Sequence, residues 1–192
     1  MPPSAVRRFR PAELERFLVA VDAELRQRSV MVMIGGGAAA LGYGVRTATQ
    51  DIDTLTNLDG LGEAIAAARK KTGLNIPIEP TPVADLPYEF ESRLERVLPA
   101  LRHLALYVPE ANDLVLSKLM RANAGDLAAT EELHQHHPLS FEILVERFRD
   151  EMSHAIGDRK RLEQNFLLGV HVLFSELKRE EARRALSSRK NR

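Results

Sequence analysis

Two groups of residues in the first third of the chain have the types and spacing needed to handle a phosphate ester. Gly35, Gly36 and Gly37 form a turn at which backbone N–H groups can approach phosphate oxygens without a side-chain clash. Asp51 and Asp53 follow, and carboxylate oxygens are the ligands that hard cations such as Mg²⁺ or Mn²⁺ prefer. A cation held there can neutralise a triphosphate and activate an attacking hydroxyl. The two groups together predict a metal-assisted phosphate site.

The elements around these motifs predict how they are held. Residues 30–34 are a continuous apolar run of strand length that stops at the glycines, which indicates a strand buried on both faces. Residues 38–41 are good helix formers, so a short helix is expected to begin at the turn and to break at Gly42 or Gly44. Residues 51–55 alternate in polarity, which places both aspartates on one face of a second strand.

The rest of the chain predicts an α/β (α+β) fold, in which a mixed β-sheet core with helices is followed by a helical C-terminal portion. Outside the motifs, the core is expected to contain a helix from Pro11 to about residue 28, a helix over 61–71, an edge strand over 74–79 and a strand over 103–108. Later helices are expected from 110 to 120 and over 126–136, 141–153 and 158–185. We therefore expect a core over 1–125, a helical portion packed on it over 126–186 and a basic tail over 187–192.

Composition excludes several other kinds of site. The 192 residues contain no cysteine, which rules out disulfides, thiolate nucleophiles and cysteine-ligated zinc. Lysine plus arginine balance aspartate plus glutamate at 27 each, so net charge gives no overall attraction to nucleic acid. No apolar stretch reaches the length of a membrane span, and no apolar region follows the arginines near the N-terminus. A cytoplasmic protein without a membrane partner is expected.

The spacing of the motifs resembles that of a known superfamily. Gly36 and Gly37, then thirteen residues, then Asp-Ile-Asp at 51–53 are similar to the signature of the DNA polymerase beta-like nucleotidyltransferases. The approach segment 46–50, with its arginine and threonine, resembles small prokaryotic members of that superfamily. This group includes the AbiEii toxins of type IV toxin–antitoxin systems and uncharacterised, DUF6036-like nucleotidyltransferases. The resemblance covers residues 31–133.

The resemblance also implies roles for individual residues. Lys118 and Asp126 are similar to a lysine on a later helix of this group and to the aspartate that follows it. The third catalytic carboxylate of the family sits on a later strand, where the candidate is Glu79, a glutamate where aspartate is common. The implied catalytic residues are Asp51, Asp53, Lys118 and Glu79, with metal bound by Asp51 and Asp53. The implied nucleotide-binding residues are Gly35, Gly36, Gly37, Arg46, Thr49 and Asp126.

The implied activity is a metal-dependent nucleotidyltransferase, with Mg²⁺ or Mn²⁺ as cofactor. Such an enzyme moves a nucleoside monophosphate from a nucleoside triphosphate (NTP) to a hydroxyl of RNA, tRNA in particular, of a protein or of a small molecule. The resemblance to toxins adds an antitoxin-like partner protein as a hypothesis. The alternative is a degenerate member of the fold that lost its third carboxylate and works as a binding or regulatory module.

Two weaker patterns lie in the second half of the chain. Arg149 and His154 match the loose arginine–histidine pattern of HEPN ribonucleases, which makes a helical ribonuclease a third hypothesis. His134, His136 and His137 could suggest a metal site, but we interpret them as histidines that complement a helix C-terminus.

Overall fold

The computed structural model describes residues 7–47, 49–81 and 83–187, which fold as two compact units. The first, here called the sheet unit, consists of the chain up to Val83 together with Leu94–Pro109. The second, the helical unit, consists of Ala84–Arg93 and the chain from Glu110 onward. The mixed sheet with helices and the helical C-terminal portion predicted from the sequence are both confirmed.

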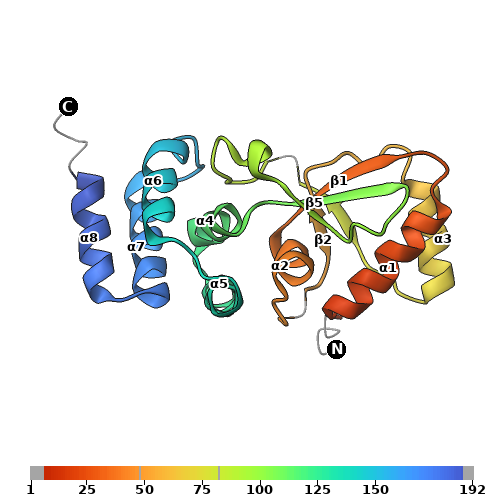
Figure 1. Ribbon diagram of the computed structural model, residues 1–192, viewed down its shortest axis with the longest axis horizontal. Helices are drawn as coiled ribbons and strands as arrows, with labels where there is room; N and C mark the ends of the chain where they lie inside the picture. Colours follow the sequence, from red (N-terminus) through yellow and green to blue (C-terminus); the bar gives the residue numbers. More distant parts are fainter. Residues whose placement is uncertain (1–6, 48, 82, 188–192) are drawn as a thin grey trace, which may run out of the picture. The chain divides into compact units, whose positions relative to one another are not determined.

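The sheet unit is built on a mixed five-stranded sheet (Figure 1). Its strands lie in the order β3-β2-β1-β5-β4, with β1 in the centre. β1 pairs parallel with β5 and antiparallel with β2, while β2 pairs parallel with β3 and β5 antiparallel with β4. The strands are β1 Ser29–Ile34, β2 Ile52–Thr54, β3 Ile78–Pro80, β4 Glu95–Val97 and β5 Leu104–Val108.

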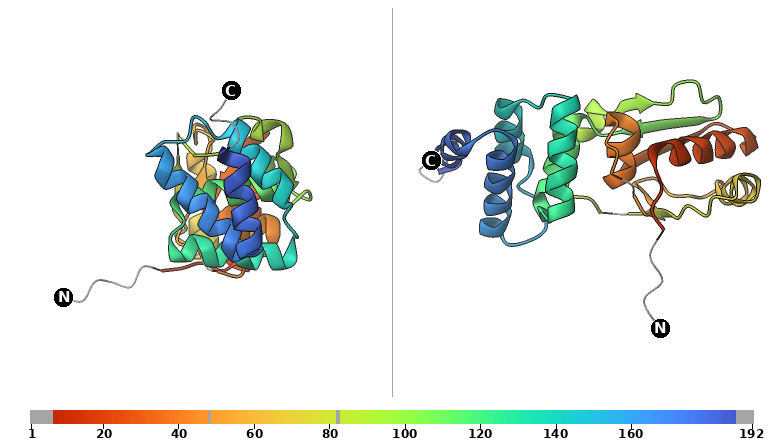
Figure 2. Two further views of the ribbon diagram at one scale, coloured as in Figure 1. Left: turned by 90° about the vertical axis from the view of Figure 1, so that its left-hand side faces the viewer. Right: turned by 90° about the horizontal axis from the view of Figure 1, so that it is seen from below.

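Three helices complete this unit: α1 Pro11–Glu24, α2 Gly35–Tyr43 and α3 Gly62–Thr72. α1 and α3 pack side by side (Figures 1 and 2), and α1 buries its apolar stripe, including Leu14, Phe17 and Leu18, completely. α2 continues directly from β1 and packs against β1 and β2. The strand–turn–helix connection predicted at the glycines is therefore confirmed.

A buried carboxylate ties α1 to the start of β5. Asp22 accepts hydrogen bonds from the backbone N–H groups of Arg102 (3.1 Å), His103 (2.7 Å) and Leu104 (2.7 Å). Burial by itself would raise the pKa of Asp22, but these three donors outweigh it and hold the pKa below its ordinary value. The charged carboxylate thus anchors the connection that brings β5 alongside β1.

The structure corrects two details of the predicted sheet. β1 is completely buried on one face only, because Met31 and Met33 are covered while Val30 on the opposite face is 53% exposed. The strand predicted over 74–79 begins only at Ile78, although its predicted position at a sheet edge is confirmed. Strand β4 was not predicted, since its three residues include two charged side chains and show no apolar pattern.

In its described residues, the helical unit contains a short 3₁₀ turn, η1, and five α-helices. Their bounds are η1 Phe90–Arg93, α4 Ala111–Arg121, α5 Ala124–His136, α6 Phe141–Glu151, α7 Arg159–Leu173 and α8 Glu176–Ser187. Within this unit α7 packs against α4, α5 and α8, and α6 packs against α4 and α8 (Figures 1 and 2). Stacked rings of Phe148 and Phe166, 4.2 Å apart, form part of its core.

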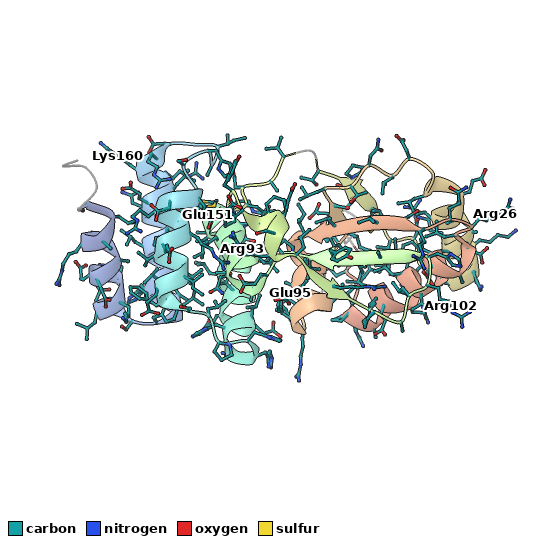
Figure 3. All side chains as sticks on the ribbon, turned by 45° about the horizontal axis from the view of Figure 1, so that its top comes forward. Arg26, Arg93, Glu95, Arg102, Glu151 and Lys160 are labelled. Atoms are coloured by element: carbon teal, nitrogen blue, oxygen red, sulfur yellow. The ribbon has the colours of Figure 1, made fainter. Side chains whose placement is uncertain are left out.

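Partly buried ion pairs fasten η1 to α4 and α6, and Figure 3 labels Arg93 of η1 and Glu151 of α6. Asp113 is completely buried and receives two hydrogen bonds from Arg93, at 2.8 and 3.2 Å, and one from Arg147 at 2.7 Å. Arg93 also donates to Glu151 (2.7 Å), and Arg147 donates to Glu110 (2.5 Å). Burial opposes the charged forms of Glu110 and Glu151, yet their arginine partners lower the pKa of both. The five side chains form one continuous network.

The single helix predicted over 158–185 is wrong, because two helices occupy this stretch. The predicted helix is interrupted at Phe174, whose ring packs against His134 and Phe141. Ser175 Oγ then accepts a hydrogen bond from the Lys178 N–H at the start of α8. The basic tail predicted over 187–192 lies outside the described residues except for Ser187. Within the described ranges, no helix has the length and apolar character needed to cross a membrane.

Candidate metal and nucleotide site

Strand pairing brings two of the predicted carboxylates together. Asp53 on β2 is in register with Glu79 on β3, so both side chains leave the sheet on the same face. Asp51 immediately precedes β2. One ligand oxygen from each of these three residues lies within 4.8 Å of the others. In the part of the chain that the structure describes, no second group of three or more carboxylate, histidine or cysteine ligands gathers in this way.

The donor set of this triad fits a hard divalent cation. Two oxygens on opposite sides of an octahedral Mg²⁺ lie about 4.2 Å apart, since each Mg–O distance is about 2.1 Å. The ligand oxygens of the triad lie within 4.8 Å of one another, so small side-chain rotations would bring them to the spacing of a bound cation. Three carboxylates at this spacing also repel one another, which a bound cation would relieve. Asp51 and Asp53 are half-buried, and Glu79 is exposed.

Gly35 faces the triad from the end of β1. β1 pairs with β2 so that Ile34 lies opposite Asp53, and the chain then turns into α2 at Gly35 with a φ of +67°. A Cβ atom added at Gly35 would lie 2.6 Å from Asp53 Oδ2. Both the left-handed backbone and the close carboxylate therefore require glycine at this position.

Thr49 links the second glycine to the first carboxylate. Its hydroxyl donates to the backbone oxygen of Asp51 at 3.2 Å and approaches Asp51 Oδ1 at 3.4 Å. A Cβ atom at Gly36 would lie 2.7 Å from Thr49 Oγ1, so the missing side chain makes room for this hydroxyl. At Gly37, by contrast, a Cβ atom would make only ordinary contacts, the nearest with Met33 Sδ at 3.6 Å.

Two threonines that the sequence analysis missed hold β2 against β1. Thr54 Oγ1 donates to the Val32 carbonyl (2.8 Å), and Thr56 Oγ1 accepts from the Val32 N–H (2.9 Å). Thr54 Oγ1 also accepts from the Thr56 N–H at 3.1 Å. These bonds continue the strand pairing beyond Asp53 and help to fix its position. The available signal was the spacing of Thr54 and Thr56, which puts both side chains on one side of an extended segment.

Lys118 and Asp126 lie in the helical unit and form an ion pair there. The Lys118 side chain is only 6% exposed, and its Nζ lies 3.6 Å from Asp126 Oδ1. Asp126 also receives two hydrogen bonds from Arg121 and one from Asn123. Lys118 is therefore buried against Asp126, and the N-cap of α5 is Asn123.

The remaining predicted residues are exposed or partly buried. Arg46 is exposed in the loop that connects α2 to Thr49. Arg149 forms an ion pair with the adjacent Asp150, and the His154 ring makes an edge contact with Tyr88. His134 Nδ1 accepts a hydrogen bond from the Leu139 N–H, which occupies this histidine in a local contact after α5.

The mixed sheet, the glycine turn that opens α2 and the adjacent carboxylates are together suited to metal-assisted chemistry on a phosphate ester. A family model described as "Nucleotidyltransferase of unknown function (DUF6036)" matches residues 14–180. The chain therefore belongs to this nucleotidyltransferase family, as its motifs predicted. No curated protein and no solved structure shows significant similarity to it.

Proposed function

We propose that this chain transfers a nucleoside monophosphate from an NTP to an acceptor hydroxyl. One observation carries the proposal: Asp51, Asp53 and Glu79 converge to within 4.8 Å beside the glycine turn. These residues would hold Mg²⁺ or Mn²⁺, which supplies charge neutralisation on the triphosphate and activation of the attacking hydroxyl.

Backbone groups of the glycine turn are proposed to hold the triphosphate. Gly35 is the first residue of α2, and no side chain caps this helix. The N–H groups of the first turn have no intrahelical acceptor, so they can donate to phosphate oxygens, and the helix dipole favours negative charge there. Because Gly35 and Gly36 lack side chains, the phosphates can approach the backbone beside Asp53.

The proposed reaction exchanges one phosphoester bond for another. The acceptor oxygen forms a bond to the α-phosphorus, while the bond from that phosphorus to the β-bridging oxygen breaks and pyrophosphate leaves. Glu79, the exposed member of the triad, is proposed to accept the hydroxyl proton. Arg46 is assigned to the leaving pyrophosphate.

RNA, tRNA in particular, is the acceptor that we favour, and a partner protein is the second choice. Membership of a nucleotidyltransferase family supports the NTP donor but leaves the acceptor open. A toxin role with an antitoxin-like partner rests on the resemblance of the approach segment 46–50 to toxin relatives.

The test is incorporation of label from each α-labelled NTP, with Mg²⁺ or Mn²⁺ and total cellular RNA. An Asp51→Asn, Asp53→Asn double variant removes two metal ligands, and Asp59→Asn, at an exposed position in the same unit, is the matched control. Label should enter the acceptor with the unaltered protein and with Asp59→Asn, but not with the double variant. If no NTP gives incorporation and triphosphate binding does not depend on metal, the chain is a degenerate binding module.

A further inference from the structure

An isolated β-bridge places the segment before α1 beside the loop that leads to Asp51. The Phe9 N–H donates to the Thr49 carbonyl (2.6 Å), and the Thr49 N–H donates to the Phe9 carbonyl (3.1 Å). The Phe9 side chain is buried, so the bridge is anchored in the core of the sheet unit. Thr49 is the residue whose hydroxyl contacts Asp51 and fills the space left by Gly36.

The two bridged segments concentrate positive charge. Residues 7–10 and the described residues of 44–50 contain four arginines and no carboxylate, although charges balance over the whole chain. All four arginines are exposed, and we call the three that precede α1 the basic edge: Arg7, Arg8 and Arg10. This local excess of charge borders the site proposed to bind an NTP.

Strand geometry directs two of these arginines into solvent. Successive side chains of an extended segment point to opposite sides, so Arg8 and Arg10 face away from buried Phe9. Phe9 and Thr49 exchange both hydrogen bonds, which puts their Cα atoms about 5.5 Å apart. Arg8 and Arg10 are each one residue from this pair, about 3.8 Å along the chain. Both therefore lie next to the loop that leads to Asp51.

Arg7 contributes less to an external site because it is already engaged. Its guanidinium lies 5.0 Å from the centre of the Phe9 ring and forms an ion pair with Glu13 at 3.2 Å. A hydrogen bond from the backbone N–H of Arg10 is the main reason that the pKa of Glu13 is lowered, so this carboxylate stays charged and offsets Arg7. Arg8 and Arg10 are left as the principal surface charges before α1.

We propose that the basic edge binds the phosphate backbone of the nucleic-acid strand whose hydroxyl is the acceptor. This inference rests on the proposed function and adds the surface that holds its acceptor. Arginine suits the role because its planar guanidinium donates two parallel hydrogen bonds to a phosphate. A triphosphate is a single compact anion, whereas guanidinium groups spaced along an extended segment match the repeated charges of a polymer.

The test compares two charge-reversed variants of the full chain. Arg8→Glu, Arg10→Glu alters the basic edge, and Arg26→Glu, Arg28→Glu alters two exposed arginines beyond the other end of α1. The 14 residues of α1 span about 21 Å, so the control lies well away from the edge. Figure 3 labels Arg26 of the control pair. Binding of a short fluorescent single-stranded RNA is measured without NTP by anisotropy, at salt concentrations from about 50 to 200 mM.

The altered edge should weaken RNA binding at least tenfold at the low end of the salt range. The slope of log affinity against log salt should fall by about 0.7 for each lost phosphate contact, or about 1.4 for the pair. The control pair should leave both quantities unchanged. Metal-dependent NTP binding, measured separately, should also be retained when the edge is altered. An Arg8→Gln, Arg10→Gln variant should show the same direction of change, and thermal unfolding checks that each variant is folded.

Several outcomes would overturn the basic edge as an acceptor surface. These are no RNA binding by the unaltered chain, equal losses in the two reversed pairs, or unchanged RNA affinity with weakened NTP binding. The last result would assign Arg8 and Arg10 to the triphosphate instead. RNA binding that depends on the edge, with no nucleotide transfer under any condition, would refute the proposed function and leave the edge intact as a nucleic-acid surface.

Discussion

Replacing Gly35 with alanine should weaken metal binding, and the same replacement at Gly44 separates this effect from that of backbone strain. The new Cβ atom would lie 2.6 Å from Asp53 Oδ2, and real Cβ atoms essentially never approach closer than 3.0 Å. The Asp53 carboxylate must therefore retreat by at least 0.4 Å, the difference between these two distances. Displacing a ligand in this way should lower Mn²⁺ affinity and nucleotide transfer about 10- to 100-fold.

Gly44→Ala is the matched control, because it carries the same backbone strain without the collision. The φ of Gly44 is +66°, against +67° for Gly35, and a Cβ atom there would meet nothing within 4 Å. Each alanine should cost about 1–2 kcal/mol of stability through the left-handed backbone, which lowers Tm by about 2–8 °C. Only Gly35→Ala should also weaken the metal site.

Mn²⁺ binding, followed by electron paramagnetic resonance, and label incorporation would be measured for both variants at a temperature where both are folded. If Gly35→Ala kept the Mn²⁺ affinity of the unaltered protein, it would refute the view that Gly35 makes room for a metal-binding Asp53. Equal losses of Mn²⁺ affinity in the two variants would also count against it, because they would point to a general effect of instability in the sheet unit.

Three further perturbations test single contacts. Thr49→Val removes the hydroxyl bonded to Asp51 and should weaken Mn²⁺ binding about tenfold in the same titration, whereas Thr49→Ser should not. Asp22→Asn should cost about 2 kcal/mol in urea unfolding at neutral pH, because a neutral amide is a weaker acceptor for one buried and two partly buried N–H groups. The pKa of Asp22 is lowered by folding, so its contribution to the free energy of unfolding is complete above its ordinary pKa of 3.8. That contribution is lost as pH falls through the lowered pKa. The difference in stability between Asp22→Asn and the unaltered protein should therefore shrink in acid. Asp113→Ala leaves two partly buried arginines without this carboxylate partner and should lower the free energy of unfolding by about 3–5 kcal/mol in the same assay. A loss of less than about 1 kcal/mol would contradict a stabilising role for the network.

Much of the sheet unit could be predicted because its signals are local. The apolar run that ends at Gly35 required a buried strand followed by a tight turn, and the alternation over 51–55 required a strand with its carboxylates on one face. Both features follow from the two-residue alternation of side chains in an extended chain and from the backbone conformations open to glycine. Neither needs knowledge of distant residues. The structure has this strand, turn and helix in the predicted places.

Other features had a weak local signal or none. The helix boundary at Phe174 is marked locally only by Ser175, whose hydroxyl accepts from the Lys178 N–H, while the ring of Phe174 packs against the distant His134 and Phe141. β4 forms because β5 offers a free edge, although its own residues favour no strand. The burial of Lys118 could likewise not be read from its neighbours, since its partner Asp126 belongs to the next helix.

The sequence by itself determined the residue types of the site, namely a glycine turn, an aspartate pair and a candidate glutamate on a later strand, and with them the family to which the chain belongs. Only the tertiary structure decided that Glu79 joins Asp51 and Asp53, because the register of β2 with β3 sets which residues face one another across the sheet. The structure likewise decided that Phe9 pairs with Thr49, forty residues along the chain. Strand register and long-range pairing depend on the folding of the whole unit, so spacing within one segment does not encode them.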